Sequence, residues 1–278
     1  MCIFNINLSQ PSNRPQIVSY SEFVYFDRCS MEMTIKKRKQ YIQALQNNKL
    51  LKGLPEYRLQ NILNDLEEET WTKHTCRVDR QKSLFHFYFI LSGRLKVYKV
   101  DKDTGREFTL FILTKNDVFD VLCLLEQTEH PVYYETLDKV GLLCAPMGKM
   151  RQWVQENPEI NRNMLPYLGQ QLKTMEEYAS NVTLIDISTR LAKLILTHIN
   201  SESKKLELIN DLSNEELANL IGSTRAVVNR HLQDFKNDGI LSLGRQKVEI
   251  KNLQLLLERA NISSQKKPNT AADDLTEK

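Results

Sequence analysis

The stretch "LSNEELANLIGSTRAVVNRHLQDF", residues 212–235, places a short helical pattern on each side of Gly222. Ser213 and Glu216 have the S-x-x-E spacing of a capping box, which predicts that the first helix starts there. Glycine permits the sharp turn between the two helices. The stretch therefore predicts a helix-turn-helix. Its two helices have apolar stripes that predict their buried faces: Leu217, Leu220 and Ile221 in the first, and Val228, Leu232 and Phe235 in the second.

The buried stripe of the second helix turns a polar side toward solvent. Four residues of its first two turns are expected to be exposed: Arg225, Ala226, Asn229 and Arg230. The second helix of such a motif enters the major groove N-terminus first. An arginine fork can bond O6 and N7 of guanine, a contact worth roughly 1–3 kcal/mol of discrimination. Ser223 or Thr224 can cap this helix, and because helix N-termini attract phosphate, Ser213, Ser223 and Thr224 are predicted to lie near the DNA backbone.

A hairpin follows the second helix. The stretch "GILSLGRQKVEI", residues 239–250, predicts two strands with a turn at Gly244. Arg245 and Lys247 near its tip are expected to contact phosphates, which makes the module a winged helix-turn-helix. Its charge is balanced, because residues 211–251 hold six Lys or Arg and six Asp or Glu. The net charge of +3 over 278 residues does not by itself indicate a polyanion partner. DNA binding is therefore predicted from placement, and a plain packing unit is the alternative.

Residues 67–146 have the texture of short strands. The segments "LFHFYFILSGRLKVYKV", "EFTLFIL" and "VGLLCAP" are rich in aromatic and β-branched residues, and turns are expected at Ser92–Gly93 and at residues 101–105. Strands of this kind close on themselves to hide their edges. We expect a small antiparallel barrel or roll.

A helical region is predicted from about Lys149, with its regular part beginning just after Pro166. Within it, apolar residues step by three and four, which is typical of a coiled-coil seam. The alternative is that the same stripe packs on the barrel of its own chain. A new helix is expected after a hinge, capped by Asp186 or Ser188. The predicted dimer seam consists of Leu165, Leu168, Leu172, Met175, Ala179 and Val182.

The rest of the chain carries few signals. Residues 1–32 are unassigned, a helical pattern begins at Met33, and the polar residues 261–278 are expected to be a disordered tail. There is no apolar run of membrane-span length and no signal peptide, so we expect no membrane contact and a cytoplasmic location. Five cysteines without a CxxC motif predict reduced thiols and no metal or cofactor, and we find no catalytic constellation. The cysteines are Cys2, Cys29, Cys76, Cys123 and Cys144.

Three motifs occur in the order found in the Crp/Fnr superfamily of bacterial transcription regulators. The helix-turn-helix stretch, the hinge segment "LIDISTRLAKLIL" and the roll segment "FYFILSGRLKVYKVDKDTGREFTLFILTKNDVF" resemble that family over residues 33–257. The segments "FDVLCLLEQ" and "GSTRAVVNR" most resemble its nitrogen-control branch. The resemblance implies an α+β protein with an N-terminal antiparallel β-roll (a double-stranded β-helix or jelly roll), a long dimerisation helix and a C-terminal winged helix-turn-helix. The corresponding ranges are 33–165, 166–185 and 186–260.

The resemblance also implies a homodimer on a two-fold symmetric operator of double-stranded DNA. Arg225 and Arg230 would read bases, and RNA polymerase would be the partner in activation. Ala226 stands where some relatives carry an acidic base reader, so a different operator is expected. Ala226 can touch a thymine methyl but cannot accept a bond from cytosine.

The predicted effector pocket departs from the cyclic-nucleotide-binding members. Asp120 and Val121 replace their Gly-Glu pair, and Pro131 and Val132 replace their Arg-Ser pair. No cation remains there to neutralise phosphate, and Asp120, Glu126 and Glu129 would repel it, so cyclic nucleotide binding is not expected. The arginine of the branch that senses an oxo-acid is also missing, and the effector is left open. The residues predicted for this pocket are Phe119, Asp120, Val121 and Leu122.

His86, Cys123 and His130 are more readily explained as satisfied structural residues than as haem or metal ligands. The function expected from the sequence is a sequence-specific transcription regulator. A small-molecule sensor that acts through protein partners is the alternative, and a cupin-like enzyme is a weaker one because the five histidines lack a cupin ligand set.

Overall fold

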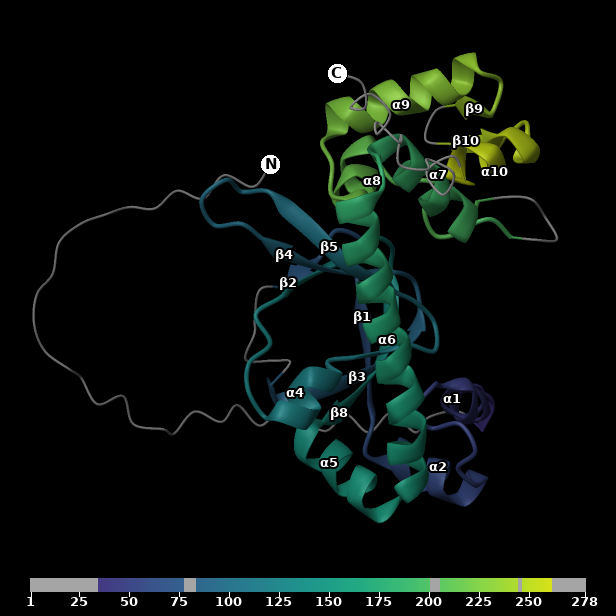
Figure 1. Cartoon of the computed structure of the whole chain (residues 1–278). Helices are drawn as coiled ribbons and strands as arrows, with labels where there is room; N and C mark the ends of the chain where they lie inside the picture. The colour runs from purple at the N-terminus through teal and green to yellow at the C-terminus, as the bar shows by residue number, and fades with distance from the viewer. Residues whose placement is uncertain (1–34, 78–83, 201–205, 245–246, 262–278) are drawn as a thin grey trace, which may run out of the picture.

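The computed structural model describes residues 35–77, 84–200, 206–244 and 247–261. The expectations for residues 1–32 and for the tail from residue 262 onward lie outside the described residues. Figure 1 shows a β-roll in the middle of the molecule, a long helix beside it and a C-terminal module at one end.

The β-roll consists of two four-stranded antiparallel sheets, ordered β1-β8-β3-β6 and β2-β7-β4-β5. Aromatic side chains fill the space between them, and the rings of Tyr88 and Phe119 stack at 4.8 Å. The strands begin at Glu67 and end at Pro146, which confirms the predicted β region. They are β1 (Glu67–Trp71), β2 (Cys76–Arg77), β3 (His86–Ser92), β4 (Leu95–Val100), β5 (Glu107–Leu113), β6 (Val118–Phe119), β7 (Tyr133–Thr136) and β8 (Val140–Pro146).

Helices close the end of the roll opposite the C-terminal module (Figure 1). They share one apolar core with β3 and β8, to which Leu45, Leu59, Phe87 and Met150 contribute. Burying the apolar stripe of each helix against the sheet is the main source of its stability. These helices are α1 (Ile35–Asn47), α2 (Glu56–Asn64), α4 (Val121–Glu126) and α5 (Met147–Glu156).

The long helix α6 (Pro158–Leu184) runs alongside the roll toward the C-terminal module (Figure 1). It packs on the roll through Ile160, Met164 and Tyr167. The prediction that the regular helix begins after Pro166 is wrong, since Pro166 lies inside α6. Proline removes one helical hydrogen bond, and its position on the exposed side leaves the freed carbonyl group to water.

The C-terminal module begins after an extended residue, Ile185. The Asp186 side chain accepts a hydrogen bond from the Thr189 amide at 3.0 Å, which confirms it as the cap of α7. The module has its own core, and Leu137 of the roll belongs to the same buried cluster, so the module is docked on the roll. Its elements are α7 (Ile187–Thr197), α8 (Asn214–Ile221), α9 (Arg225–Asn237), β9 (Leu241–Gly244), β10 (Lys247–Ile250) and α10 (Leu253–Asn261).

Candidate nucleic-acid interface and ligand cavity

Helix α8 begins with the predicted capping box. The Ser213 amide donates to Glu216 Oε2 at 2.6 Å, and the Glu216 amide donates to Ser213 Oγ at 3.2 Å. Leu217 and Ile221 are buried as expected, whereas Leu220 is only half-buried. Ala218 takes the remaining buried position, since it lies one residue after Leu217 on the face that packs inward.

The turn between the two helices depends on Gly222. Its φ is +65°, and a Cβ at this position would lie 2.6 Å from the Tyr178 hydroxyl of α6. Only glycine adopts this conformation without steric cost. The next residue, Ser223, is 8% exposed, and its hydroxyl has no hydrogen-bond partner within the described residues. Ser223 therefore does not lie on the predicted DNA-contacting surface, because the turn directs it inward.

Helix α9 is capped by Thr224, whose hydroxyl accepts from the Val227 amide at 3.5 Å. Its buried residues are the three predicted ones, and its outward side presents the four predicted polar-face residues: Arg225, Ala226, Asn229 and Arg230. The Asn229 side chain accepts a hydrogen bond from Asn214 of α8 at 3.0 Å. Within the described part of the chain, neither arginine has a hydrogen bond or an ion pair. Both guanidinium groups are therefore available to a ligand.

The predicted wing is present as the antiparallel pair β9–β10, in which Val248 is opposite Leu243. The Asn210 side chain accepts from the Val248 amide at 3.1 Å and so fixes the hairpin to the segment before α8. Arg245 lies outside the described residues, and only the backbone of Lys247 is described. Their predicted phosphate contacts stay predictions.

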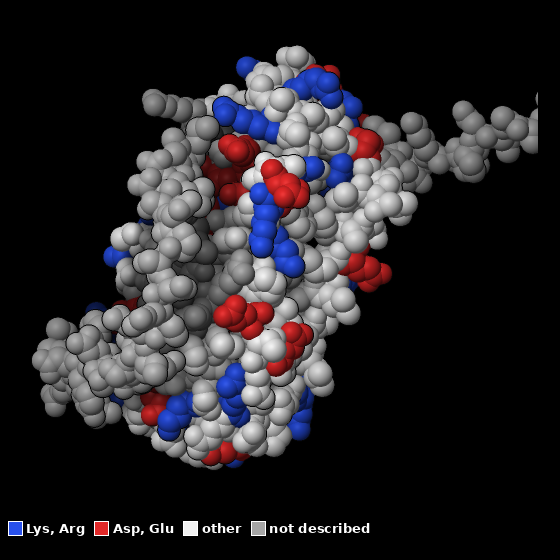
Figure 2. All heavy atoms as spheres, turned by 90° about the vertical axis from the view of Figure 1, so that its left-hand side faces the viewer, with Lys and Arg blue, Asp and Glu red and all other residues white. Residues whose placement is uncertain are grey.

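The charges on the molecule are mixed. Figure 2 shows Lys and Arg side chains gathered at the upper end, where the C-terminal module lies, with Asp and Glu side chains below them. The position of the basic side chains is therefore a better indication of an anionic partner than the small net charge.

Arg94 of the roll fixes the module in place, a role that the sequence did not reveal. Its guanidinium donates to Asp138 at 2.6 and 2.7 Å, and to Asp211, just before α8, at 2.7 and 2.8 Å. It also donates to the Leu208 carbonyl oxygen at 2.5 Å. The side chain of Arg94 is 12% exposed. No local signal identifies this residue, since it follows a predicted turn and its partners are distant in the sequence.

A second link joins the roll to α8. The buried Lys96 ammonium group pairs with Glu135 at 2.6 Å and with Glu107 at 3.1 Å. Burial by itself lowers the pKa of Lys96, but the hydrogen bond that it donates to Glu135 and the charges of both carboxylates outweigh burial and raise the pKa. Glu107 also accepts from the Asn219 side chain of α8 at 3.4 Å. The position of α8 thus depends on residues of the roll.

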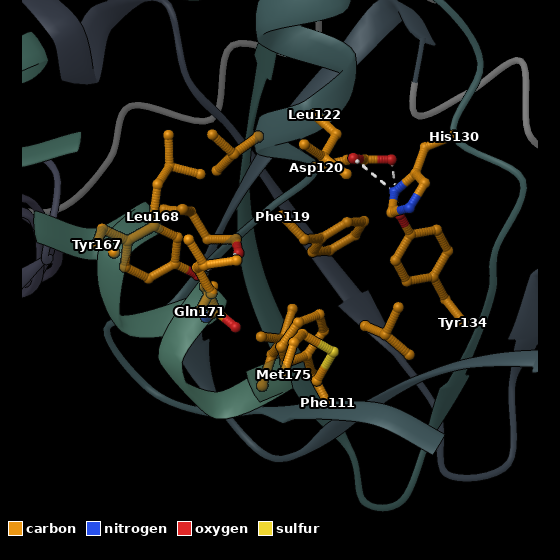
Figure 3. Close-up of a pocket in the computed structure, with 16 residues that line it drawn as sticks. Phe111, Phe119, Asp120, Leu122, His130, Tyr134, Tyr167, Leu168, Gln171 and Met175 are labelled. Atoms are coloured by element: carbon orange, nitrogen blue, oxygen red, sulfur yellow. Dashed lines mark hydrogen bonds and ion pairs between the residues drawn. The ribbon is translucent and has the colours of Figure 1, made fainter. Parts of the chain in front are cut away.

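A cavity of about 490 Å³ lies between the roll and α6. The four residues predicted for the effector pocket all line it, together with residues from β4, β5, β7 and α6 that the sequence did not connect. Figure 3 shows Asp120, His130 and Tyr134 on one side of the cavity and Leu168 and Gln171 on the other. Its lining consists of Val97, Phe111, Leu113, Val118, Phe119, Asp120, Val121, Leu122, His130, Tyr134, Tyr167, Leu168, Gly169, Gln171, Leu172 and Met175.

Asp120 is the buried charge of this cavity. It accepts from the Tyr134 hydroxyl at 2.7 Å, from His130 Nδ1 at 3.2 Å, and from the Cys123 thiol at 3.2 Å and amide at 3.4 Å. Burial raises its pKa, but the hydrogen bonds from His130 and Tyr134 outweigh burial and bring the pKa of Asp120 below its usual value. The carboxylate is therefore charged at neutral pH. His130 and Cys123 have structural partners, as the sequence indicated.

The predicted seam on α6 is divided by the structure. Leu168 and Met175 are half-buried and line the cavity, so these two positions face their own roll. Leu165 is 72% exposed, Leu172 is 71% exposed, and Ala179 and Val182 are also exposed. Exposed apolar side chains in a row are typical of a surface that a partner covers.

Other kinds of site are not evident in the described ranges. They contain no group of three His, Cys, Asp or Glu side chains that could hold a metal ion. Among their helices, none combines the length and the apolar character needed to cross a membrane. Cys144 is a buried thiol, and burial raises its pKa to about 12.

Comparison with known proteins agrees with this arrangement. Residues 189–259 match the Crp-like helix-turn-helix domain, and residues 74–157 match the cyclic nucleotide-binding domain. A CRP-like cAMP-activated global transcriptional regulator from Mycobacterium tuberculosis is 29% identical over 177 residues, which cover 62% of this chain and 79% of that protein. The two matched domains and the described modules coincide in order. The chain belongs to the Crp/Fnr superfamily.

Other Crp/Fnr proteins match over similar lengths. A global nitrogen regulator from Nostoc is 29% identical over 207 residues, which cover 69% of this chain and 92% of that protein. The solved structure of a CooA mutant from Carboxydothermus hydrogenoformans is 26% identical, with a TM-score of 0.59, and the match covers 72% of this chain and 90% of that one. Since the CRP-like and nitrogen-control relatives are equally identical to the chain, these identities do not separate the two branches.

The lining of the cavity bears on the expectation that no cyclic nucleotide binds there. In the described part of the chain, no lysine or arginine lines the cavity. Val132, at one of the positions that the resemblance gives to Arg-Ser, is 2% exposed, and Pro131 at the other is exposed to solvent. Glu126 and Glu129 are exposed and do not line the cavity, so the predicted repulsion of phosphate comes from Asp120.

Proposed function

We propose that this Crp/Fnr transcription regulator binds a palindromic operator as a homodimer in the cytoplasm, with Arg225 and Arg230 reading base edges. The observation that carries the proposal is that both guanidinium groups are exposed and unpaired, within the described residues, on the first two turns of α9. The opposite side of α9 is fixed in the core by Val228 and Phe235. A rigid helix with two such guanidinium groups in its N-terminal turns suits recognition of guanine in the major groove.

Phosphate contacts would complete the interface. Ser213 and Thr224 lie at the N-termini of α8 and α9, where free amides and the helix dipole favour an anion. Ala226 and Asn229 lie beside the two arginines and would face the same base pairs. Arg245 and Lys247 belong to the wing and would contact the backbone of the duplex.

The homodimer is supported by the exposed part of the α6 seam, where Leu172 is 71% and Val182 39% exposed. Two parallel copies of this stripe would bury apolar area, which stabilises by about 25 cal/mol per Å². A two-fold axis along α6 would also duplicate α9. The two reader helices would then lie about 34 Å apart, one turn of DNA, and would read symmetric half-sites.

The proposal excludes a cyclic nucleotide as the effector. A cyclic phosphate entering the cavity would lose water while facing the Asp120 carboxylate, and no lysine or arginine of the described lining would compensate for it. The chain is assigned no catalytic step. Where it activates transcription, the resemblance implies that RNA polymerase is its partner.

The test is selection of bound sequences from a pool of random DNA duplexes by the full-length chain, followed by DNA shift assays. The selected site should be palindromic. Arg225→Ala and Arg230→Ala should each reduce the preference for that site over a scrambled duplex by about 1–3 kcal/mol, which is a factor of roughly 5 to 150. The matched control is Lys236→Ala, which removes the same charge at the exposed last turn of α9.

Lys236→Ala should weaken binding to the selected and the scrambled duplex equally, because a contact to phosphate carries no sequence information. A selection that returns no consensus would favour a sensor that acts through protein partners. If Arg225→Ala and Arg230→Ala keep the full preference for the selected site over the scrambled duplex, the assignment of the two arginines as base readers is overturned.

A further inference from the structure

The cavity beside α6 has the dimensions of a small-molecule site. Its volume of about 490 Å³ lies within the range typical of ligand pockets. The lining is dominated by aliphatic and aromatic side chains from both the roll and α6, including Phe111, Phe119 and Met175 (Figure 3). An apolar surface of this extent favours an apolar ligand, since its burial releases water from both partners.

The Asp120 carboxylate of the cavity already has hydrogen-bond donors within the protein. The two Asp120 oxygens accept four hydrogen bonds, and its side chain is only 2% exposed. This carboxylate therefore does not require a cationic ligand. An anionic ligand would meet the negative charge of Asp120 beside a mainly apolar lining, where like charges repel. Both considerations favour an uncharged molecule.

The Nε2 atom of His130 is suited to orient such a molecule, and the Gln171 side chain lies on the opposite wall (Figure 3). His130 uses Nδ1 for Asp120, which leaves Nε2 as the other ring atom, and 19% of the side chain is exposed to the cavity or solvent. When Nδ1 carries the proton that is donated to Asp120, Nε2 is an acceptor. Asp120 is thus a positioning residue that fixes the His130 ring and its tautomer.

We propose that the cavity binds an uncharged, mainly apolar small molecule that donates one hydrogen bond to His130 Nε2. Phe111, Phe119 and Met175 hold its apolar body. This inference goes beyond the proposed function, and it is tested without DNA, so that either can fail alone. Because Leu168, Leu172 and Met175 belong both to the cavity and to the predicted seam, the bound molecule would contact the dimerisation helix directly.

Two fluorescent probes with the same ring system test the ligand class. N-phenyl-1-naphthylamine is uncharged and has one N–H donor, and 1-anilinonaphthalene-8-sulfonate adds a sulfonate to it. The full-length chain should bind the uncharged probe saturably, and the sulfonate should bind at least about tenfold more weakly because it faces Asp120. Equal affinity for the two probes would overturn the proposed exclusion of anions.

Variants establish where the probe binds. Met175→Trp should fill part of the cavity and weaken the uncharged probe by about tenfold, since the pocket then lacks the space for it. The control is Glu176→Trp, which places the same side chain on the next, exposed residue of α6 outside the cavity lining. Its affinity should match that of the unsubstituted chain. Unchanged binding by Met175→Trp would overturn the assignment of the cavity.

A third variant tests the role of charge. Asp120→Asn keeps a side chain that can cap α4 but removes the negative charge. The ratio of the dissociation constants of the two probes should fall by at least about threefold, because the sulfonate binds more tightly. An unchanged ratio would overturn the explanation by Asp120. Circular dichroism and thermal unfolding of each variant identify a loss of folding. If Asp120→Asn does not fold, Leu122→Lys adds a positive charge at an exposed residue of the cavity rim, and this variant should bind the sulfonate more tightly than the unsubstituted chain does.

Discussion

Arg94 and Asp211 form a two-pronged ion pair between the β-roll and the C-terminal module, with Nη1–Oδ1 and Nη2–Oδ2 distances of 2.7 and 2.8 Å. The two residues are 117 positions apart in the chain. The same guanidinium also binds Asp138 of the roll. This contact fixes the segment that leads directly into the capping box of α8, so the orientation of α8 and α9 depends on a residue of the β-roll.

Arg94→Met should lower the free energy of unfolding by about 1–3 kcal/mol, because hydrogen bonds to charged groups are lost while the apolar stem is kept. Both carboxylates are more than a third exposed and can regain water, so the lower part of this range is expected. Urea unfolding midpoints measure the change. Lys102→Met is the control, since it removes the same charge at an exposed turn of the β4–β5 hairpin.

The same variant has a predicted pH dependence. The hydrogen bond from Arg94 lowers the pKa of Asp211 in the folded chain. A carboxyl group with a lowered folded-state pKa stabilises the fold above its ordinary pKa of about 4, and this contribution is lost as the pH falls through the lowered value. The difference in the free energy of unfolding between the unsubstituted chain and Arg94→Met should therefore become smaller as the pH falls from 7 to 3. A constant difference would show that the pair contributes through packing alone.

Gly222→Ala should destabilise the helix-turn-helix by at least about 1–2 kcal/mol, since a Cβ is strained at positive φ. The Cβ would also approach the Tyr178 hydroxyl at 2.6 Å. Thermal or urea unfolding measures the loss, and adding Tyr178→Phe should recover only the part due to this contact. Gly148→Ala is the control: it lies in α5 with open space around its Cβ, and it should be neutral or stabilising by up to about 1 kcal/mol.

Leu172→Lys should give monomers, because it places a charge in the middle of the exposed apolar stripe of α6. Light scattering at several protein concentrations measures the mass. Gln170→Lys adds the same side chain about 200° away around the helix and should leave the dimer intact. A dimeric mass for Leu172→Lys would locate the dimer interface elsewhere.

Ala226→Glu should change the selected operator at one position in each half-site, because a glutamate can accept a hydrogen bond from cytosine N4. The residue is exposed, so folding should be unaffected. Selection from a random duplex pool reads the new consensus. Gln233→Glu adds the same charge about 10 Å further along α9 and should weaken binding without altering the consensus. An unchanged consensus for Ala226→Glu would remove Ala226 from the base-reading surface.

Much of the reader module follows from local sequence. The capping box at Ser213, the turn at Gly222 and the buried stripe of α9 all lie within 24 consecutive residues, and each depends on helical periodicity or on the conformational freedom of one residue. The same reason explains why the β region from Glu67 to Pro146 could be predicted from its alternating and aromatic segments. It also explains why Arg225 and Arg230 could be placed on the exposed face.

The errors arise where neighbours in space override the local pattern. Pro166 was expected to precede the regular helix, yet packing of Ile160 and Met164 against the roll extends α6 on both sides of it. Ser223 was expected at the DNA surface, but the turn directs it inward. The stripe on α6 predicts a seam or packing on the chain's own barrel, and the structure places Met175 in a cavity whose other wall comes from the roll.

The sequence by itself determined the identity, order and exposed faces of the reader helices, because these depend on interactions between residues three or four positions apart. The tertiary structure alone decided that Arg94 holds the module against the roll and that Asp120, His130 and Tyr134 meet beside α6. Those contacts join segments far apart in the chain, and their energies depend on burial and distance, which no periodicity encodes.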